Sequence, residues 1–191
     1  MKKIWFLRIT AFVLLLSGSF LLADGCWIRT KAVFAQILLQ HAWEETLATG
    51  KNTKAWPWAD TWPIARLTME RLRIDLIILE GDSGEVLAFG PGHLQASSEP
   101  GSSGNCILAG HRDTAFKFLQ DLKKDDVLTL QTFDGSIYKY RVNEMFSLQA
   151  EKLYLKESNG EHLTLITCYP FNALQSGAEF RYVVLTDRLP G

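Results

Sequence analysis

The hydrophobic pattern of the chain begins with a basic end followed by a long apolar run. Lys2 and Lys3 precede residues 4–23, in which Arg8 is the only charged residue. A membrane-spanning helix needs about 20 apolar residues, and the long side chain of Arg8 can reach the interface. Because basic residues precede the apolar core, the pattern predicts an N-terminus inside the cell and an exported remainder.

A cleaved signal peptide and a lipidated cysteine are the alternatives to this anchor. Ala23, Asp24 and Gly25 form a passable small-x-small cleavage site directly before Cys26. Lipidation of Cys26 is less favoured, because the third residue before it is Ala23 rather than Leu. We expect residues 1–26 to form an uncleaved membrane anchor, and all three interpretations export the rest of the chain.

Residues 27–62 combine a helical pattern with an irregular one. Apolar residues recur at steps of three and four between Ile28 and Ala42, which predicts a juxtamembrane helix. Residues 50–63 hold three tryptophans and two prolines with almost no periodicity. Because proline lacks an amide donor and favours extended geometry in the residue before it, this second part is expected to be a linker.

From residue 63 onward the pattern changes to short apolar or alternating runs separated by turn residues. Eight runs are strand candidates: residues 64–69, 73–79, 85–89, 105–110, 127–133, 137–142, 162–167 and 181–187. Asp134-Gly135 is the clearest hairpin turn, and residues 114–122 suit one short helical turn. This spacing predicts one all-β domain over residues 63–191, either a barrel or a sandwich.

Composition and charge exclude several classes of protein. The 191 residues allow one globular domain with a short appendage, and 47% of them are hydrophobic, too many for a disordered chain. Twenty Lys and Arg against 21 Asp and Glu give no basic excess for nucleic acid. Three cysteines without a close Cys/His cluster favour neither a disulfide framework nor a zinc site, and they leave at least one thiol unpaired within the monomer.

One cysteine, one histidine and one arginine stand at predicted strand ends. Cys168 ends the run LTLITC, and Pro170 prevents a regular continuation of that strand. A thiol with a pKa of about 8.5 needs a base or a positive neighbour to act as a nucleophile, and His111 also follows an apolar strand. Arg181 opens the last strand, so an antiparallel return after one loop would bring it beside Cys168.

Each of these residues also has a purely structural interpretation. A lone cysteine on an apolar strand is usually a small buried hydrophobe, and a lone histidine is usually hydrogen-bonded within the fold. The joint placement at strand ends favours chemistry, but spacing alone leaves both interpretations open.

Three stretches of the chain form recognisable motifs: LAGHRDTAF with the upstream GSSGN, LTLITCYPF followed by RYVV, and FGPGHL. These motifs resemble the sortase family, whose members are membrane-anchored cysteine transpeptidases. The resemblance extends from about Pro63 to Leu189. It implies an all-β, eight-stranded closed barrel with short helices behind an N-terminal transmembrane helix. The segment WPWADTWPIARL resembles the Gram-negative, class GN branch of the family.

The resemblance also implies a catalytic triad and a reaction. His111, Cys168 and Arg181 match the family's catalytic residues. The Cys168 thiolate would attack the carbonyl after Thr in an LPxTG-like C-terminal sorting signal, and an amine acceptor of unknown identity would resolve the thioester. His111 would exchange protons with the leaving and incoming amines, and Arg181 would bind the carbonyl or the oxyanion. Thr167, Tyr169 and Arg112 are candidate substrate-binding residues.

The resemblance implies an enzyme that is a thiol protease of the hydrolase class. It also implies that a single helix holds the protein in the inner membrane and that the catalytic domain lies in the periplasm. Neither a metal nor a cofactor is expected, because the carboxylates around the last loops are scattered: Glu144, Glu151, Glu157 and Glu161. Two other functions remain possible from the residues. One is a non-catalytic, exported barrel that binds extended peptides, and the other is a peptidase that uses water as acceptor.

The third cysteine, Cys106, is expected to face away from this site. In a strand it has the same orientation as Leu108, whereas His111 has that of Ile107 and Ala109. The alternation therefore predicts that Cys106 is dispensable for chemistry.

Overall fold

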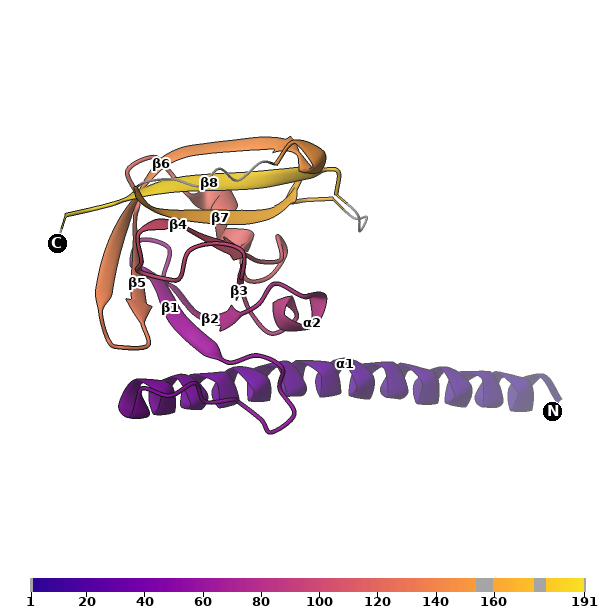
Figure 1. Cartoon of the computed structure of the whole chain (residues 1–191). Coiled ribbons are helices and arrows are strands. Elements are labelled where there is room, and N and C mark those ends of the chain that lie inside the picture. The colour runs from indigo at the N-terminus through magenta and orange to yellow at the C-terminus, as the bar shows by residue number, and fades with distance from the viewer. Residues whose placement is uncertain (1, 154–159, 174–177, 191) are drawn as a thin grey trace. The chain divides into compact units, whose positions relative to one another are not determined.

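The structure is a computed structural model that describes residues 2–153, 160–173 and 178–190 (Figure 1). It divides into two compact units, residues 1–37 and residues 38–191. The helix α1, Lys2–Thr49, provides all of the described first unit, and many of its apolar side chains, including Leu14, Leu15 and Phe20, are exposed. Within the described part of the chain, no helix combines the length and apolar character needed to cross a membrane, so the expected span over residues 4–23 is not shown.

The second unit is built on eight strands that close into a barrel. They are β1 (Pro63–Met69), β2 (Ile74–Glu80), β3 (Gly92–His93), β4 (Gly104–Ala109), β5 (Val127–Thr132), β6 (Ile137–Gln149), β7 (Glu161–Tyr169) and β8 (Phe180–Arg188). Around the barrel the order is β1-β2-β3-β4-β7-β8-β6-β5. Among the described residues the short helices are α2 (Gly84–Leu87), η1 (Lys117–Asp121) and η2 (Ala150–Lys152). The eight-stranded closed barrel is therefore confirmed.

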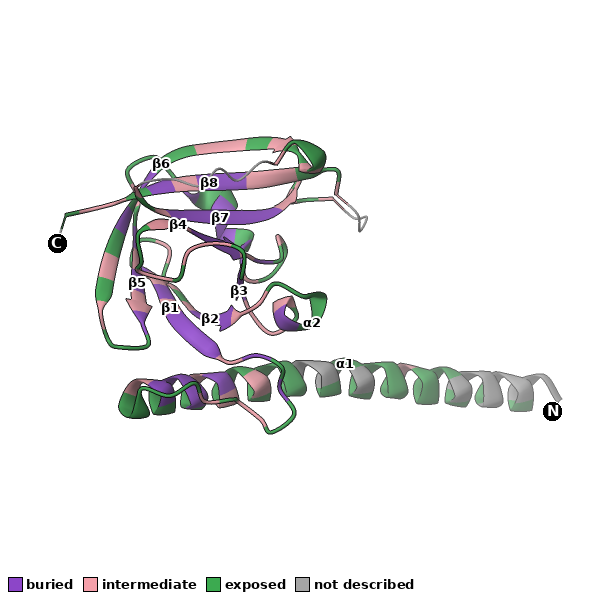
Figure 2. Cartoon of the chain, viewed as in Figure 1, coloured by how far each residue is buried: buried purple, intermediate pink, exposed green. Residues whose placement is uncertain are grey.

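Alternating side chains divide the strands between the barrel interior and its outer surface. The main buried cluster takes one set of alternating residues, such as Leu67, Ile78, Leu108, Leu165 and Val184. Figure 2 shows buried residues along β1 and β7. The period of two that predicted the strands is thus the pattern that fills the barrel.

The C-terminal end of α1 is part of the barrel unit. Leu39 and Trp43 are buried against Ile77 and Leu79, which face outward from β2 on either side of the inward-facing Ile78. Helix α1 ends at Thr49, and Gly50 follows with φ of +66° and donates its amide to the carbonyl of Thr46. The helix expected from Ile28 is therefore continuous with the N-terminal segment, while the domain boundaries at residues 26 and 62 stay predictions.

The strand expected over residues 85–89 is wrong, because this segment forms α2. Ser83 caps the helix, with its Oγ accepting a hydrogen bond of 3.3 Å from the amide of Val86, and Glu85 lies in the favourable first turn. The missing barrel strand is β3, which is only two residues long. A Cβ at Gly92 would lie 2.0 Å from the carbonyl oxygen of Gly81, so this close backbone approach requires glycine.

Candidate active site

The parallel pairing of β4 with β7 determines which residues meet at one end of the barrel. Gly104 lies beside Glu161, and the same register continues to Ala109 beside Ile166. Both strands therefore end at the same edge of the sheet, where the sequence predicted that polar side chains would follow apolar strands.

Two further hydrogen bonds carry this register one residue beyond β4. The amide of Gly110 donates to the carbonyl of Ile166 at 3.2 Å, and the buried hydroxyl of Thr167 donates to the carbonyl of Gly110 at 2.7 Å. His111 directly follows Gly110, and Cys168 directly follows Thr167. The register thus directs the histidine-bearing loop to the side of Cys168.

The other neighbour of Cys168 is Arg181. Strands β7 and β8 are antiparallel, and Cys168 is the direct partner of Arg181 in their register. Cys168 and Arg181 are partly buried and His111 is exposed, so solvent reaches all three residues. Cys168 and Arg181 are consequently adjacent, and the segment that carries His111 leaves β4 beside the end of β7.

These residues share the outer face of the barrel with a small apolar cluster. Its buried members are Ile107, Ile166 and Val183, one from each of β4, β7 and β8. Cys168 lies two residues after Ile166, and Arg181 lies two residues before Val183, so strand alternation puts them on the same face. The three side chains of the cluster are buried, and the partly exposed Leu94, Phe146 and Leu148 pack against them on the face that carries the thiol.

The backbone of His111 is held by the turn that follows it. Its carbonyl accepts the amide of Phe116 at 2.9 Å and the amide of Thr114 at 3.4 Å. Phe116 is fully buried beneath Gly110, where an added Cβ would lie 2.7 Å from the aromatic ring. Glycine before His111 is therefore needed for the ring to pack under this loop.

The guanidinium of Arg181 is oriented by the backbone just before β8. Its Nη1 donates to the carbonyl of Ala178 at 2.7 Å and to that of Phe180 at 3.2 Å. Among the described residues, its Nε and Nη2 have no protein acceptor. These donors can therefore meet a carbonyl or an oxyanion formed next to Cys168.

Of the candidate substrate-binding residues, Thr167 and Tyr169 are engaged within the protein. The Thr167 hydroxyl bonds to Gly110, as described, and the ring of Tyr169 stacks on that of Tyr182 with centroids 6.0 Å apart. Burial and the neighbouring Tyr169 raise the pKa of Tyr182. Strand alternation places Tyr169 on the opposite face from Cys168, which favours packing as its role.

The third candidate, Arg112, links two loops beside the site. Its Nη2 donates to the carbonyl of Ala173 at 3.1 Å, so it joins the segment after His111 to the segment after Cys168. A role of Arg112, Thr167 or Tyr169 in substrate binding stays a prediction.

The interior position of Cys106 confirms that it faces away from this site. Cys106 belongs to the main interior cluster and is only 1% exposed. Burial raises the pKa of its thiol, and the negative charges of Glu99 and Glu80 add to that effect. Cys106 is therefore an inert interior residue, whereas Cys168 is accessible.

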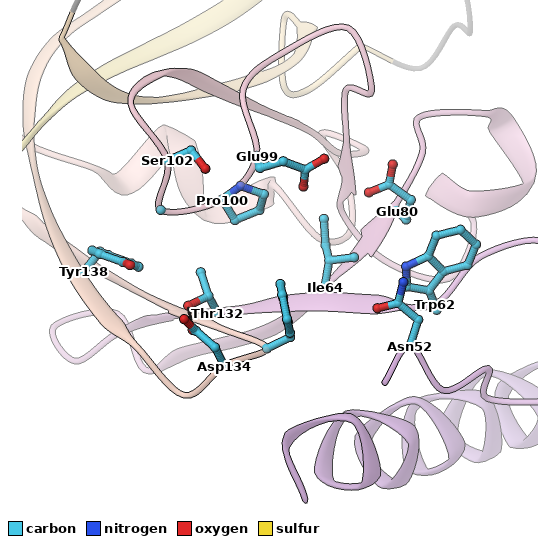
Figure 3. A pocket seen from close by; sticks show the side chains of 12 residues that line it. Asn52, Trp62, Ile64, Glu80, Glu99, Pro100, Ser102, Thr132, Asp134 and Tyr138 are labelled. Carbon is cyan, nitrogen blue, oxygen red and sulfur yellow. Dashed lines mark hydrogen bonds between the residues drawn. The ribbon is translucent and has the colours of Figure 1, made fainter. Parts of the chain in front are cut away.

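The cavity drawn in Figure 3 lies at a different place. It has a volume of about 530 Å³, and its lining includes Glu80 from β2 and residues 99–102, which precede β4. His111 follows β4, so the length of that strand separates the cavity from the candidate catalytic residues.

Comparisons with known proteins agree with this arrangement. The model of the sortase domain family matches residues 67–189. Sortase D of Bacillus subtilis strain 168 is 31% identical over 124 residues, and this match covers 64% of the chain but only 62% of that protein.

Two solved structures show the same fold. Sortase C-1 of Actinomyces oris has a TM-score of 0.59 and 30% identity, with 68% of this chain and 74% of that chain covered. Sortase C of Clostridium perfringens, solved with the C-terminal cell wall sorting motif, has a TM-score of 0.62 and 21% identity, with 85% and 91% covered. With a closed barrel, a strand-end cysteine paired with an arginine, and a family match over most of the barrel, the chain belongs to the sortase family.

Proposed function

We propose that this protein is a cysteine transpeptidase that cleaves an LPxTG-like C-terminal sorting signal and transfers the new carboxyl end to an amine. The observation that carries the proposal is the strand register, in which Cys168 is the partner of Arg181 and the β4–β7 alignment leads to His111. This is the arrangement that nucleophilic acyl transfer requires: a nucleophile, a proton carrier and a fixed positive charge.

The first half of the reaction forms an acyl-enzyme. The Cys168 thiolate adds to the carbonyl carbon after the threonine of the signal, and the carbonyl oxygen becomes an oxyanion beside the Arg181 guanidinium. The tetrahedral intermediate then expels the amine of the next residue, which takes a proton from His111. The products are a thioester on Cys168 and a free C-terminal fragment.

The second half reverses the same steps with a different amine. His111 removes a proton from the incoming amine, which attacks the thioester carbonyl and forms an amide bond. The Cys168 thiolate leaves, and the site returns to its starting protonation state. Arg181 serves both halves because its charge does not depend on working pH.

The proposed substrate class rests on the family and on the outer surface next to Cys168. The related sortase C of Clostridium perfringens was solved with a C-terminal cell wall sorting motif. In this chain the apolar cluster of Ile107, Ile166 and Val183 lies on the face shared by Cys168. The partly exposed Leu94, Phe146 and Leu148 pack against this cluster and offer apolar surface to an extended segment.

We also propose that the chain is an inner-membrane protein with its barrel in the periplasm. The support is the order of charges and apolar residues, with Lys2, Lys3 and Arg8 at the N-terminal side of the apolar run. Cell fractionation together with protease treatment of spheroplasts tests this part. We expect the intact chain in the membrane fraction and a barrel that the protease cleaves. A barrel that stays in the cytoplasm and is protected from the protease would contradict this location.

The reaction is tested by incubating the purified full chain in detergent with an LPxTG-type peptide, with and without an amine. Mass spectrometry is expected to show a thioester on Cys168 and an amine-dependent ligated product. Cys168→Ala should lose both, whereas the matched control Cys106→Ala should keep both because that thiol is buried in the interior. A hydrolysed product that the amine never diverts would instead indicate a peptidase. No adduct with any peptide of a C-terminal-signal library would contradict catalysis and favour a peptide-binding barrel.

A further inference from the structure

Three side chains with metal-ligating atoms converge beside the cavity of Figure 3, and two of them line it. They are Glu80 at the end of β2, His93 in β3 and Glu99 in the loop before β4, and one ligating atom from each lies within 4.8 Å of the others. Figure 3 shows the carboxylates of Glu80 and Glu99 at the same side of the cavity. The proposed reaction uses none of these residues.

The hydrogen bonds of His93 point to a cation in this cluster. Its Nε2 lies 3.0 Å from the carbonyl oxygen of Ser98, which can only accept, and 3.2 Å from the hydroxyl oxygen of Ser97. The Ser97 hydroxyl gives its own proton to the carbonyl of Leu94 at 2.7 Å, so the geometry favours a proton on Nε2. In a neutral imidazole Nδ1 then has a lone pair, and this lone pair faces a carboxylate oxygen of Glu80 at 3.3 Å. Two acceptors that face each other need either a proton or a metal cation between them.

The burial of His93 and the negative charges near it favour a cation at this contact. His93 is fully buried, and Glu80 is only 13% exposed, so water screens their contact weakly. Glu99 adds a second carboxylate, and among the described residues its side chain has no hydrogen-bond or ion-pair partner. No lysine or arginine of the described chain forms a salt bridge with either glutamate.

We propose that Glu80, His93 and Glu99 bind a first-row divalent transition-metal ion of the zinc type. Neutral imidazole with two carboxylates is a ligand set that suits zinc, and an open cavity supplies water for the fourth position. The ion would bind Nδ1 of His93, while the Nε2 proton keeps its bond to the Ser98 carbonyl. Metal-ligating histidines usually hold their second nitrogen in this way, which fixes the tautomer and the ring orientation.

The geometry needs only a small closure of the side chains. Ligand atoms up to 4.8 Å apart are wider than a zinc ion with bonds of about 2.0–2.2 Å allows. Glu99 is exposed on a loop and can swing inward, whereas His93 is fixed in the barrel. The bound ion would tie the ends of β2 and β3 to the loop that leads into β4.

The test uses the full chain in detergent with Cys168→Ala as the parent, because a thiol at the catalytic site would itself bind zinc. Calorimetric titration with zinc is compared among the parent, Glu80→Gln, Glu99→Gln and the control Glu70→Gln, an exposed glutamate in the turn between β1 and β2. Each of the two ligand variants is expected to bind zinc about tenfold or more weakly, since even outer-shell losses cost about 10–100-fold. Glu70→Gln should match the parent.

Thermal unfolding and a cobalt spectrum complete the experiment. Zinc should raise the melting temperatures of the parent and of Glu70→Gln. It should raise the melting temperature of Glu99→Gln much less. The melting temperature of Glu99→Gln without metal shows whether this variant is folded. Cobalt should give d–d absorption without a thiolate charge-transfer band, and Glu99→Gln should weaken it. The proposal is overturned if either ligand variant binds zinc as tightly as the parent, or if magnesium binds the parent as tightly as zinc.

Discussion

The hydrogen bond between Thr167 and Gly110 offers a sharp test of how the barrel positions His111. Thr167→Val removes the hydroxyl and keeps nearly the same shape and volume. In the native protein this hydroxyl donates to the Gly110 carbonyl at 2.7 Å, directly before His111, and Thr167 is only 2% exposed. The substitution leaves that carbonyl without its donor and releases the segment that carries His111.

The expected magnitude follows from the burial of this bond. Leaving a buried acceptor unsatisfied costs about 1–3 kcal/mol of folding free energy. For the reaction, a reacting group displaced by about 1 Å can lose about 10²-fold in rate, so we expect acyl-enzyme formation to slow by at least about tenfold.

Thr186→Val is the matched control for this prediction. Thr186 is 1% exposed, and its hydroxyl donates to the carbonyl of Leu163 at 2.7 Å. The bond therefore has the same chemistry, but it lies near the other end of β7, away from Cys168. The control should lose a similar free energy of unfolding and keep its rate of acylation.

Two measurements on each variant decide the outcome. Urea denaturation gives the free energy of unfolding, and the initial rate of thioester formation on Cys168 gives the chemical effect. An unchanged acylation rate in Thr167→Val would refute the reasoning that Thr167 positions His111. A loss of rate in Thr186→Val as large as in Thr167→Val would refute it as well.

Three other predictions concern the loops and the barrel. Gly110→Ala should destabilise the protein by about 1–3 kcal/mol and slow acylation, because the added Cβ would lie 2.7 Å from the ring of Phe116; unchanged urea midpoint and rate would contradict this. Ser83→Ala removes the cap of α2 and should cost about 1 kcal/mol in urea denaturation, with an unchanged acylation rate; Ser83→Asp, which preserves the cap, should restore the stability. Arg71 bonds to Asp126 and lowers the pKa of that carboxyl, so this pair stabilises the fold above the ordinary aspartate pKa of about 3.9 and loses its effect as pH falls through the lowered value. Asp126→Asn should therefore lose less stability in acid than the native protein, as measured by thermal unfolding from pH 6 down to about pH 2. An unchanged dependence of stability on pH would contradict this role of the Arg71–Asp126 pair.

Local patterns explain which elements could be predicted. The strands that became β1, β2 and β4 to β8 have alternating or buried apolar runs of sufficient length, and the Asp134-Gly135 turn joins β5 to β6, with Gly135 at φ of +83°. The segment over residues 85–89 was misassigned because a four-residue helix shows too little periodicity to outweigh its β-prone residues. The two-residue strand β3 had no pattern at all.

The residues of the candidate active site could be selected from the sequence, but their arrangement in space could not be predicted from it. Cys168, His111 and Arg181 stood at strand ends next to turn residues, and the family motifs singled them out. Their adjacency depends on the parallel register of β4 with β7 and on the antiparallel register of β7 with β8. A shift of either register by one residue would turn the side chains to opposite faces.

The amino-acid sequence by itself determined the alternation that makes a barrel, the choice of Cys168 as the candidate nucleophile and the interior position of Cys106. These depend on periods of two along single strands and on chemistry held by single residues. Only the tertiary structure decided that Thr167 holds the segment before His111, and that Glu80, His93 and Glu99 come together in one cluster. Such contacts join residues far apart in the chain, and the order and register of the strands, which no local pattern encodes, bring them together.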